Sequence, residues 1–363
     1  MKKLLSVFMI AVLCIAVFSG CDSKTQTSSV PSQQSSLSPS SQEASSQQEL
    51  IPEGMMLNAL TGEYTLAEGS ATLPVSVMIC NDAHSKSQPG IDKADLYIET
   101  ETEGGISRIL TVFPNVDSIP SILGPCRSAR TPFVQMALSM GFVFAHAGGS
   151  PKARAMASRA DVMNIDFLRT STSFRDSDMR AKNSNKYDHC LATNAELLSK
   201  CITKKNYGTE KIKEIPWQFT EQVKAGDPAN TLQISISNSA TGNSYFVYDE
   251  KNGLYRKNIG TAENHRAHRA TEGGQIAVNN IVILYAERYV EGVDSYTRYS
   301  FKLDQGGEAV ILSGGQSRTG SYLCTDEALT LKEADGSTLQ LLRGKTYIYI
   351  VNQNIKDRTV IGA

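Results

Sequence analysis

The stretch "ADLYIETETEGGISRILTVF" (residues 94–113) contains two short runs in which apolar and polar side chains alternate, separated by Gly104 and Gly105. Alternation with a period of two is typical of β-strands, and paired glycines suit the turn between two strands. The stretch therefore predicts a hairpin made of strands 94–100 and 107–113.

The first of these strands carries acidic residues at alternate positions. Glu99, Glu101 and Glu103 are expected on one face of the strand, and Arg108 returns after the turn, so an acid could face an arginine. Two interpretations stay open. The residues form a solvated glutamate ladder, or Glu99 or Glu103 is a general acid whose pKa is raised by its neighbours.

Further strands and two helices are predicted on either side of the hairpin. Residues 74–80 and 141–147 are short apolar runs that end at turn residues. In "TPFVQMALSMG" the apolar residues recur at helical spacing, with Thr131 as the N-cap and Gly141 as the stop. Ser150 caps a second helix by the same pattern, and each helix has proline at its first position.

From about Ile215 the pattern changes to strands with hairpin signals, including Asn252-Gly253 at a turn. We therefore expect an α/β N-terminal segment with a mixed sheet and flanking helices, followed by a β-rich C-terminal domain. The predicted boundaries are 51–214 for the α/β domain with the candidate site and 215–363 for the β-rich domain.

The two helix starts predict a site for an anion. The first backbone N–H groups of a helix have no partner within the helix, and arginine adds a planar fork that matches carboxylate or phosphate. If the preceding strands are parallel, both starts lie at one edge of the sheet, where glycines let a ligand approach the backbone. The candidate ligand-binding residues are Asn81, Arg108, Arg127, Ser128, Arg130, Gly148, Gly149, Ser150 and Arg175. The candidate catalytic residues are Glu99, Glu103 and His146.

The alternative is structural. The arginines would then pair with carboxylates of the protein itself, and His146 would be a buried histidine with satisfied hydrogen bonds. A polar loop that contains Arg175, Asp176 and His189 is expected to be long, and long ordered loops often carry function.

The N-terminus has the features of a secreted lipoprotein. Two lysines precede an apolar run from Leu4 to Phe18, which is too short to span a membrane and is followed by Ser-Gly-Cys. Residues 1–21 are therefore predicted to be a signal peptide with Cys21 as the lipidated cysteine; the alternative is an ordinary signal peptide with a chance cysteine. Residues 22–50 are rich in Ser and Gln and are predicted to be a disordered linker.

Charge and cysteine content limit the partners and cofactors. The formal net charge is -1, which argues against a global attraction to nucleic acid. The cysteines after Cys21 are odd in number and have no C-x-x-C spacing, so we expect buried single thiols, or a pair between Cys190 and Cys201. His265 and His268 form only an isolated H-x-x-H, and there is no nucleotide-binding motif, so no metal and no cofactor are predicted.

Several motifs together resemble one family: "VMICN", "ADLYIETETEGGISR", "GPCRSARTPF", "HAGGSPKA", "SFRD" and "DGSTLQLLRGKTYIYIV". The chain from about Pro74 to Val351 is similar to the YerB-like lipoproteins of Gram-positive bacteria, a family of unknown function. The resemblance implies a two-part fold and an extracytoplasmic lipoprotein on the outer face of the cytoplasmic membrane. The family's motifs match Asn81, Glu99, Glu103, Arg108, Arg127, Ser128, Arg130, His146 and Arg175, whereas Cys80 stands where the family often has an acidic residue, with Asp82 and His84 after it.

Two classes of function follow from these features. In the first, the protein is an envelope lipoprotein that binds an anionic wall polymer or an acidic segment of a partner protein. In the second, it is an enzyme that cleaves a wall polymer, with Glu99 or Glu103 as the acid/base and an arginine clamp. No complete set of nucleophile and base is visible, which favours binding.

Overall fold

The computed structural model describes residues 52–66, 73–208, 213–237, 242–293 and 295–363. The signal peptide, Cys21 and the linker lie outside these residues, so the predictions for them stay predictions. The described residues form one compact unit.

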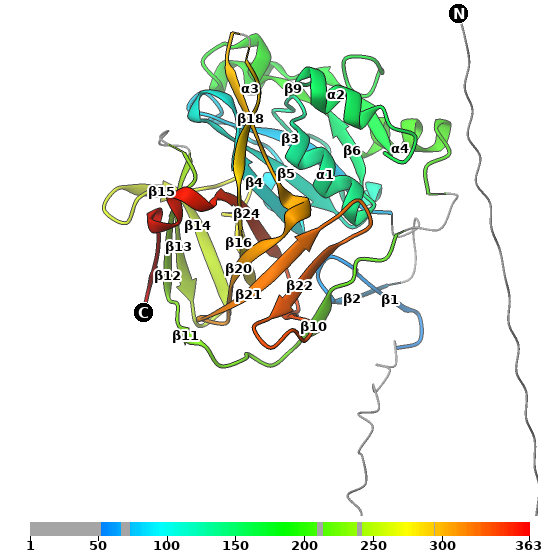
Figure 1. Cartoon of the computed structure of the whole chain (residues 1–363). Helices are drawn as coiled ribbons and strands as arrows, with labels where there is room; N and C mark the ends of the chain where they lie inside the picture. Colours follow the sequence, from blue (N-terminus) through cyan, green and yellow to red (C-terminus); the bar gives the residue numbers. More distant parts are fainter. Residues whose placement is uncertain (1–51, 67–72, 209–212, 238–241, 294) are drawn as a thin grey trace, which may run out of the picture. The chain divides into compact units, whose positions relative to one another are not determined.

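A mixed sheet of eleven strands organises the described part of the chain (Figure 1). Its order is β11-β21-β20-β17-β24-β4-β5-β3-β6-β7, and β22 pairs with β21. The strands are β3 (Val75–Asn81), β4 (Leu96–Glu101), β5 (Ser107–Phe113), β6 (Val143–His146), β7 (Asn164–Asp166), β11 (Asp227–Pro228), β17 (Asn280–Ala286), β20 (Gly307–Ser313), β21 (Gln316–Cys324), β22 (Leu329–Glu333) and β24 (Thr346–Asn352). β3, β4, β5 and β6 overlap the four N-terminal strands expected from the sequence.

The central strands are buried on both faces. Every residue of β3, β4, β5, β17 and β24 is buried. Successive side chains of β24 enter two different cores: Tyr347 and Tyr349 face one, and Ile348 and Ile350 face the other. Burial on both faces explains why the sequences of these strands are nearly continuous apolar runs.

A second sheet covers one face of the large sheet. It consists of β12 (Thr231–Ser235), β13 (Asn243–Asp249), β14 (Leu254–Gly260), β15 (His265–Ala267), β16 (Ala277–Val278) and β25 (Thr359–Gly362), in the order β15-β14-β13-β12-β25 with β16 beside β14. Phe246 and Tyr255 of this sheet lie in the same core as Tyr347. The predicted turn at Asn252-Gly253 connects β13 to β14, and Gly253 has φ +68°, which favours glycine.

Four α-helices lie in the N-terminal part of the described chain: α1 (Thr131–Met140), α2 (Pro151–Ala157), α3 (Ser177–Lys182) and α4 (Ala195–Lys204). α1 covers the face of the large sheet opposite the second sheet, and its apolar side chains share the core of Ile348. It ends at Gly141 as predicted, but its N-cap is Arg130 and not Thr131, because Thr131 already has helical geometry. Ser150 caps α2 as predicted, by accepting the N–H of Ala153.

The remaining strands form short two-stranded sheets: β1 (Met55–Leu57) with β2 (Tyr64–Leu66), β8 (Phe174–Arg175) with β9 (Leu191–Ala192), β10 (Gln218–Thr220) with β23 (Gln340–Leu342), and β18 (Arg288–Val293) with β19 (Thr297–Phe301). Short 3-10 helices are η1 (Ile91–Lys93), η2 (Glu103–Gly105), η3 (Val116–Ser118), η4 (Tyr187–His189), η6 (Leu303–Gln305) and η7 (Gln353–Arg358). The β18–β19 hairpin reaches back to the start of α1, where Glu291 contacts Thr131.

The two predicted segments share the large sheet. β4, from the N-terminal part, pairs in parallel with β24, from the C-terminal part, with Leu96 opposite Thr346. The predicted fold class, a mixed sheet with helices followed by a β-rich region, is confirmed. The boundary at 214/215 stays a prediction, and the large sheet continues across it.

Candidate functional site

The two helix starts lie side by side, although for a different reason from the one expected. β5 runs antiparallel to β3, and β3 runs parallel to β6, so the strands before the two helices are not parallel to each other. The segment after β5 returns along β3 instead: the N–H of Arg127 donates to the carbonyl of Met78 at 2.8 Å, and the N–H of Ser150 donates to Ala129 at 3.3 Å. This return brings the start of α1 beside the start of α2.

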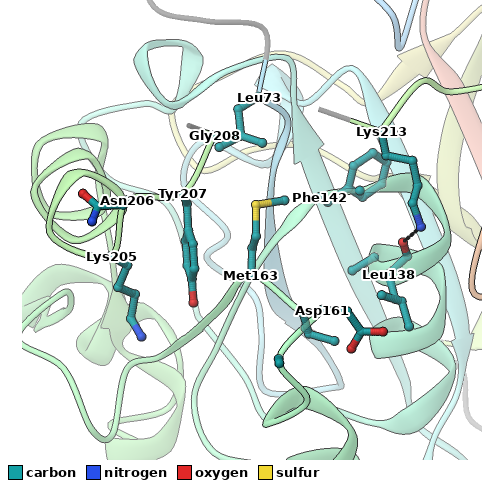
Figure 2. A pocket seen from close by; sticks show the side chains of 14 residues that line it. Leu73, Leu138, Phe142, Asp161, Met163, Lys205, Asn206, Tyr207, Gly208 and Lys213 are labelled. Atoms are coloured by element: carbon teal, nitrogen blue, oxygen red, sulfur yellow. Dashed lines mark hydrogen bonds between the residues drawn. The ribbon is translucent and has the colours of Figure 1, made fainter. Parts of the chain in front are cut away.

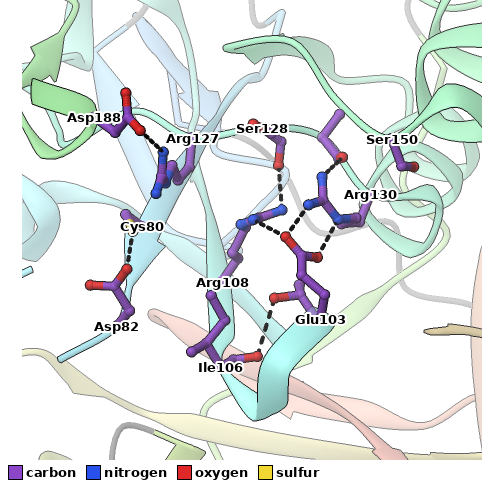
Figure 3. A network of polar contacts seen from close by, with 12 residues as sticks. Cys80, Asp82, Glu103, Ile106, Arg108, Arg127, Ser128, Arg130, Ser150 and Asp188 are labelled. Carbon is purple, nitrogen blue, oxygen red and sulfur yellow. Dashed lines mark hydrogen bonds and ion pairs between the residues drawn. The ribbon is translucent and has the colours of Figure 1, made fainter. Parts of the chain in front are cut away.

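Glu103 is the centre of a buried charge network at this edge (Figure 3). Its carboxylate accepts Nη2 of Arg108 at 2.7 Å and Nε of Arg130 at 2.6 Å, and Nη2 of Arg130 also contacts it. Arg130 further donates to the carbonyl of Ala129 at 2.6 Å, and Arg108 to that of Ser128 at 3.1 Å. These contacts make Arg108 and Arg130 partners of the protein's own carboxylate, as the structural alternative proposed.

Electrostatics in this network contradict one expectation. Burial opposes the ionisation of Glu103, but the charges of Arg108 and Arg130 outweigh it and lower the pKa of Glu103 to about 2. The expectation of a raised pKa is therefore wrong for Glu103. A carboxylate held ionised by two guanidinium groups is not poised to donate a proton near pH 7. Glu103 also lies in the turn η2 after β4, and not on the same strand as Glu99.

A second carboxylate of the protein lies at the helix starts. Glu291 of β18 is buried and accepts the hydroxyl of Thr131, the first residue of α1; its other oxygen lies 3.4 Å from the hydroxyl of Ser150, the N-cap of α2. No local pattern indicates this contact, because Glu291 is more than 140 residues from both Thr131 and Ser150. The place where an anion was expected at the helix starts is thus taken by an internal carboxylate.

Groups of the protein itself surround His146, Gly148 and Gly149. His146 is buried; its Nδ1 lies 2.6 Å from the carbonyl of Gly148 and its Nε2 lies 2.8 Å from Oδ1 of Asn164. A Cβ at Gly149 would lie 3.1 Å from the backbone oxygen of Ala129. The close backbone approach that glycine allows at Gly149 is therefore made by the protein's own chain, and a Cβ at Gly148 would lie 2.8 Å from the side chain of Leu168.

Glu99 and Asn81 lie in the interior of the sheet. Glu99 accepts the amide of Asn81 at 2.8 Å, the hydroxyl of Ser107 at 2.6 Å and the hydroxyl of Tyr347 at 2.5 Å. Nζ of Lys257, from β14, lies 3.5 Å from the same carboxylate, and neither side chain has any exposed surface. The solvated glutamate ladder is thus wrong for Glu99, and its carboxylate has no surface on which a polymer could bind.

Arg127, Ser128 and Arg175 line a separate surface cavity of about 250 Å³, together with Asp188. Arg127 lies 4.0 Å from the exposed carboxylate of Asp188, and its buried Nε has no hydrogen-bond partner among the described residues. Arg175 donates to the carbonyl of Tyr187 at 2.6 Å, and its guanidinium lies 4.0 Å above the ring of Tyr187. The structure thus brings three of the predicted ligand-binding residues to a shared cavity.

Two family models match the chain, and both are described as protein of unknown function (DUF3048). The model of the N-terminal domain matches residues 60–208, and that of the C-terminal domain matches residues 232–348. The two matches together cover more than half of the chain. The chain belongs to the DUF3048 family.

A sequence comparison and a structure comparison with YerB support the resemblance predicted from the motifs of this DUF3048 chain. The curated "Putative lipoprotein YerB" of Bacillus subtilis (strain 168) is 29% identical over 300 residues, which are 80% of this chain and 85% of that protein. The crystal structure of the YerB protein from Bacillus subtilis has a TM-score of 0.69 at 25% identity, and the match covers 84% of this chain and 99% of that chain. The resemblance to YerB-like proteins is confirmed, and the DUF3048 description assigns no reaction to them.

The structure of this DUF3048 chain tests the predictions for its cysteines and histidines. The five described cysteines are free and buried, so the prediction of single thiols is confirmed and a Cys190–Cys201 disulfide is wrong. His265 is exposed, whereas His268 is buried with Nε2 2.8 Å from Oε1 of Gln88, so H-x-x-H does not gather two ligands. His189 lies 2.7 Å from Asp82, which itself lies 3.4 Å from the thiol of Cys80.

A larger cavity, of about 550 Å³, lies at the end of α1 and contains none of the predicted site residues (Figure 2). Lys213 is one of the charged residues that line it, and its ammonium donates to the carbonyls of Leu138 at 3.0 Å and Asp326 at 2.6 Å. Because that charge already binds the C-terminal turn of α1, we place the candidate site at Arg127 and Arg175 and not here.

Proposed function

We propose that this DUF3048 protein is a lipid-anchored envelope protein that binds an anionic group at Arg127 and Arg175. The observation that carries the proposal is a contrast between neighbouring arginines. Arg108 and Arg130 each bind the carboxylate of Glu103 at close range, whereas Arg127 faces only a distant and exposed carboxylate among the described residues. A guanidinium group with unused donors is a receptor for carboxylate or phosphate.

The size of the cavity suggests how the ligand would bind. About 250 Å³ is enough for one phosphate or carboxylate group and its immediate substituents, and not for a whole polymer segment. The hydroxyl of Ser128 adds a donor beside the two guanidinium groups. The ligand would therefore be a charged group of a wall polymer or an acidic side chain of a partner protein, with the rest of the molecule outside the cavity.

The alternative, an enzyme that cleaves a wall polymer, has less support. Its proposed acid/base residues are Glu99, which is enclosed in the sheet, and Glu103, whose lowered pKa keeps it ionised. Neither is arranged to exchange a proton with a bound substrate.

Arg127→Lys tests the anion pocket. Lysine keeps the charge and loses the fork, so the affinity for inorganic phosphate, measured by NMR titration, is expected to fall by about tenfold. The fold should persist, because Arg127 holds its segment through backbone N–H and carbonyl bonds to Met78 and Ala147. Arg266→Lys, an exposed arginine of β15, is the matched control and should leave the affinity unchanged.

The result separates the two interpretations of Arg127. A lower melting temperature with unchanged phosphate affinity would make Arg127 structural and remove the pocket proposal. Weaker binding that is further reduced by added salt, at an unchanged melting temperature, would support an electrostatic site at the surface.

The lipid anchor is tested separately. Cys21→Ala is expected to release the protein from the membrane or leave the precursor uncleaved, since the proposed modified thiol is gone; fractionation and palmitate labelling measure this. Cys14→Ala, within the same apolar run, is the control and should be processed normally. A Cys21→Ala protein that is still processed and membrane-bound would contradict the anchor.

A further inference from the structure

Three potential metal ligands meet beside the end of β3. They are the thiol of Cys80, the carboxylate of Asp82 and the imidazole of His189, and one ligand atom from each lies within 4.8 Å of the other two. The thiol is 3.4 Å and Nε2 of His189 is 2.7 Å from the same oxygen, Oδ2 of Asp82. Cys80 and Asp82 appear together at the left of Figure 3. The sequence did not indicate the cluster, because His189 is 107 residues from Asp82.

The arrangement differs from that of a catalytic triad. In a triad the imidazole lies between the nucleophile and the carboxylate, and each binds a different ring nitrogen. Here the thiol and the imidazole both converge on the carboxylate, which is the middle member. Coordination of a single cation requires donor atoms that lie close to one another, and these three lie within 4.8 Å of one another.

Surrounding hydrogen bonds fix the carboxylate. Oδ1 of Asp82 accepts the backbone N–H groups of His84 at 2.9 Å and Ser85 at 3.1 Å, and the hydroxyl of Ser85 at 3.1 Å. These contacts occupy Oδ1 and leave Oδ2 directed at the thiol and the imidazole. Such outer contacts orient the ligands of known metal sites.

The loop that carries His189 is tied to the loop after β3. The amide of Asn183 donates to the carbonyl of His189 at 2.8 Å and to that of Ser87 at 3.0 Å, and it accepts the N–H of Ser87 at 2.7 Å. Asn183 is fully buried, so this bridge is shielded from water. The three ligands are thereby held together across two separate segments.

The donor set selects the kind of ion. One sulfur, one nitrogen and one oxygen suit a borderline divalent cation such as Zn²⁺ better than Mg²⁺ or Ca²⁺, which prefer oxygen. Neighbouring ligand atoms around tetrahedral zinc lie about 3.3–3.6 Å apart, given bond lengths of about 2.1 Å to N and O and about 2.3 Å to S. The 3.4 Å between the thiol and Asp82 already fits this range, and the contact between Asp82 and His189 would have to lengthen from its present 2.7 Å.

We propose that Cys80, Asp82 and His189 form a zinc site with three protein ligands and a fourth position open to water. The side chain of Asp82 keeps 11% of its surface exposed and His84 beside it is exposed, which gives an ion a route from solvent. Binding would displace the protons of the thiol and of the imidazole, because metal ligands are deprotonated. The site stands independently of the anion pocket at Arg127.

Cobalt titration of the full folded protein tests the proposal. After dialysis against a chelator, one equivalent of Co²⁺ is expected to give a thiolate-to-cobalt charge-transfer band, which one equivalent of Zn²⁺ then removes. Cys80→Ser should abolish that band, and His189→Gln should weaken Co²⁺ binding by about a hundredfold or more, since loss of an outer contact alone costs 10- to 100-fold.

Controls separate ligation from misfolding. Cys324→Ser replaces another buried cysteine, which contacts Met136 and Ser139 of α1, and should keep the band. Circular dichroism checks that each variant is folded; if Cys80→Ser is unfolded, Asp82→Asn and His189→Gln carry the test. A wild-type protein without the charge-transfer band at excess Co²⁺, or a folded Cys80→Ser that keeps it, would overturn the proposal.

Discussion

Replacing Glu103 with glutamine is expected to lower the free energy of unfolding by about 3 kcal/mol at pH 7. The amide keeps the shape of the side chain and removes the negative charge that binds Arg108 and Arg130, whose side chains are only 5% and 8% exposed. Two buried guanidinium groups would then face each other without a counter-charge. Urea unfolding of the variant and the wild type measures the difference.

The effect should depend on pH in a defined direction. The pKa of Glu103 is lowered from 4.5 in the unfolded chain to about 2 in the folded protein. A group with a depressed folded pKa contributes its stability above the unfolded pKa and loses it as pH falls toward the folded one. The difference between variant and wild type should therefore be full at pH 7, shrink below about pH 4.5 and nearly vanish near pH 2.

Glu196→Gln is the matched control for this experiment. Glu196 pairs with Lys200 on the surface of α4, where both side chains are about 70% exposed, so its replacement should change stability by less than about 0.5 kcal/mol. If Glu103→Gln behaved like this control at pH 7, the network would not hold the helix starts together.

Replacing Lys257 with methionine should also destabilise the protein strongly, by about 3–5 kcal/mol, because it leaves the carboxylate of Glu99 buried without its cation. Lys257 is fully enclosed, donates to the hydroxyl of Ser244 at 2.6 Å and lies 3.5 Å from Glu99. Burial lowers the pKa of Lys257, and the charge of Glu99 opposes that effect. The measurement is again urea unfolding at pH 7.

A double variant distinguishes the loss of a charge pair from the loss of packing. Glu99→Gln combined with Lys257→Met removes both charges and should recover most of the stability lost in Lys257→Met alone. Lys332→Met, an exposed lysine of β22 in the large sheet, should have almost no effect. A double variant as unstable as Lys257→Met would show that packing and not charge is responsible.

Local patterns were sufficient to predict most elements near the site. The alternation in residues 94–113 predicted β4 and β5, and the helical spacing before Gly141 predicted α1. Such signals depend only on neighbouring residues, so they are present in one sequence. The N-cap of α1 was misplaced by one residue, which is the normal uncertainty of a helix boundary.

Contacts between distant segments were not predictable in the same way. Glu103 and the arginines were foreseen as possible partners because they belong to one hairpin and the loop after it. Glu291 at the helix starts, Lys257 beside Glu99 and His189 beside Asp82 each join segments more than 100 residues apart. The sequence contains the chemical groups, but only the pairing of the sheets determines which of them meet.

The position of β24 has a consequence for how the chain assembles. This strand is formed by residues 346–352, near the C-terminus, yet it lies between β17 and β4 in the middle of the large sheet. During synthesis from the N-terminus, one edge of β4 stays unpaired until almost the whole sequence is available. Exposed strand edges can pair with other chains. Removal of the last twenty residues would accordingly open the centre of the sheet and not its margin.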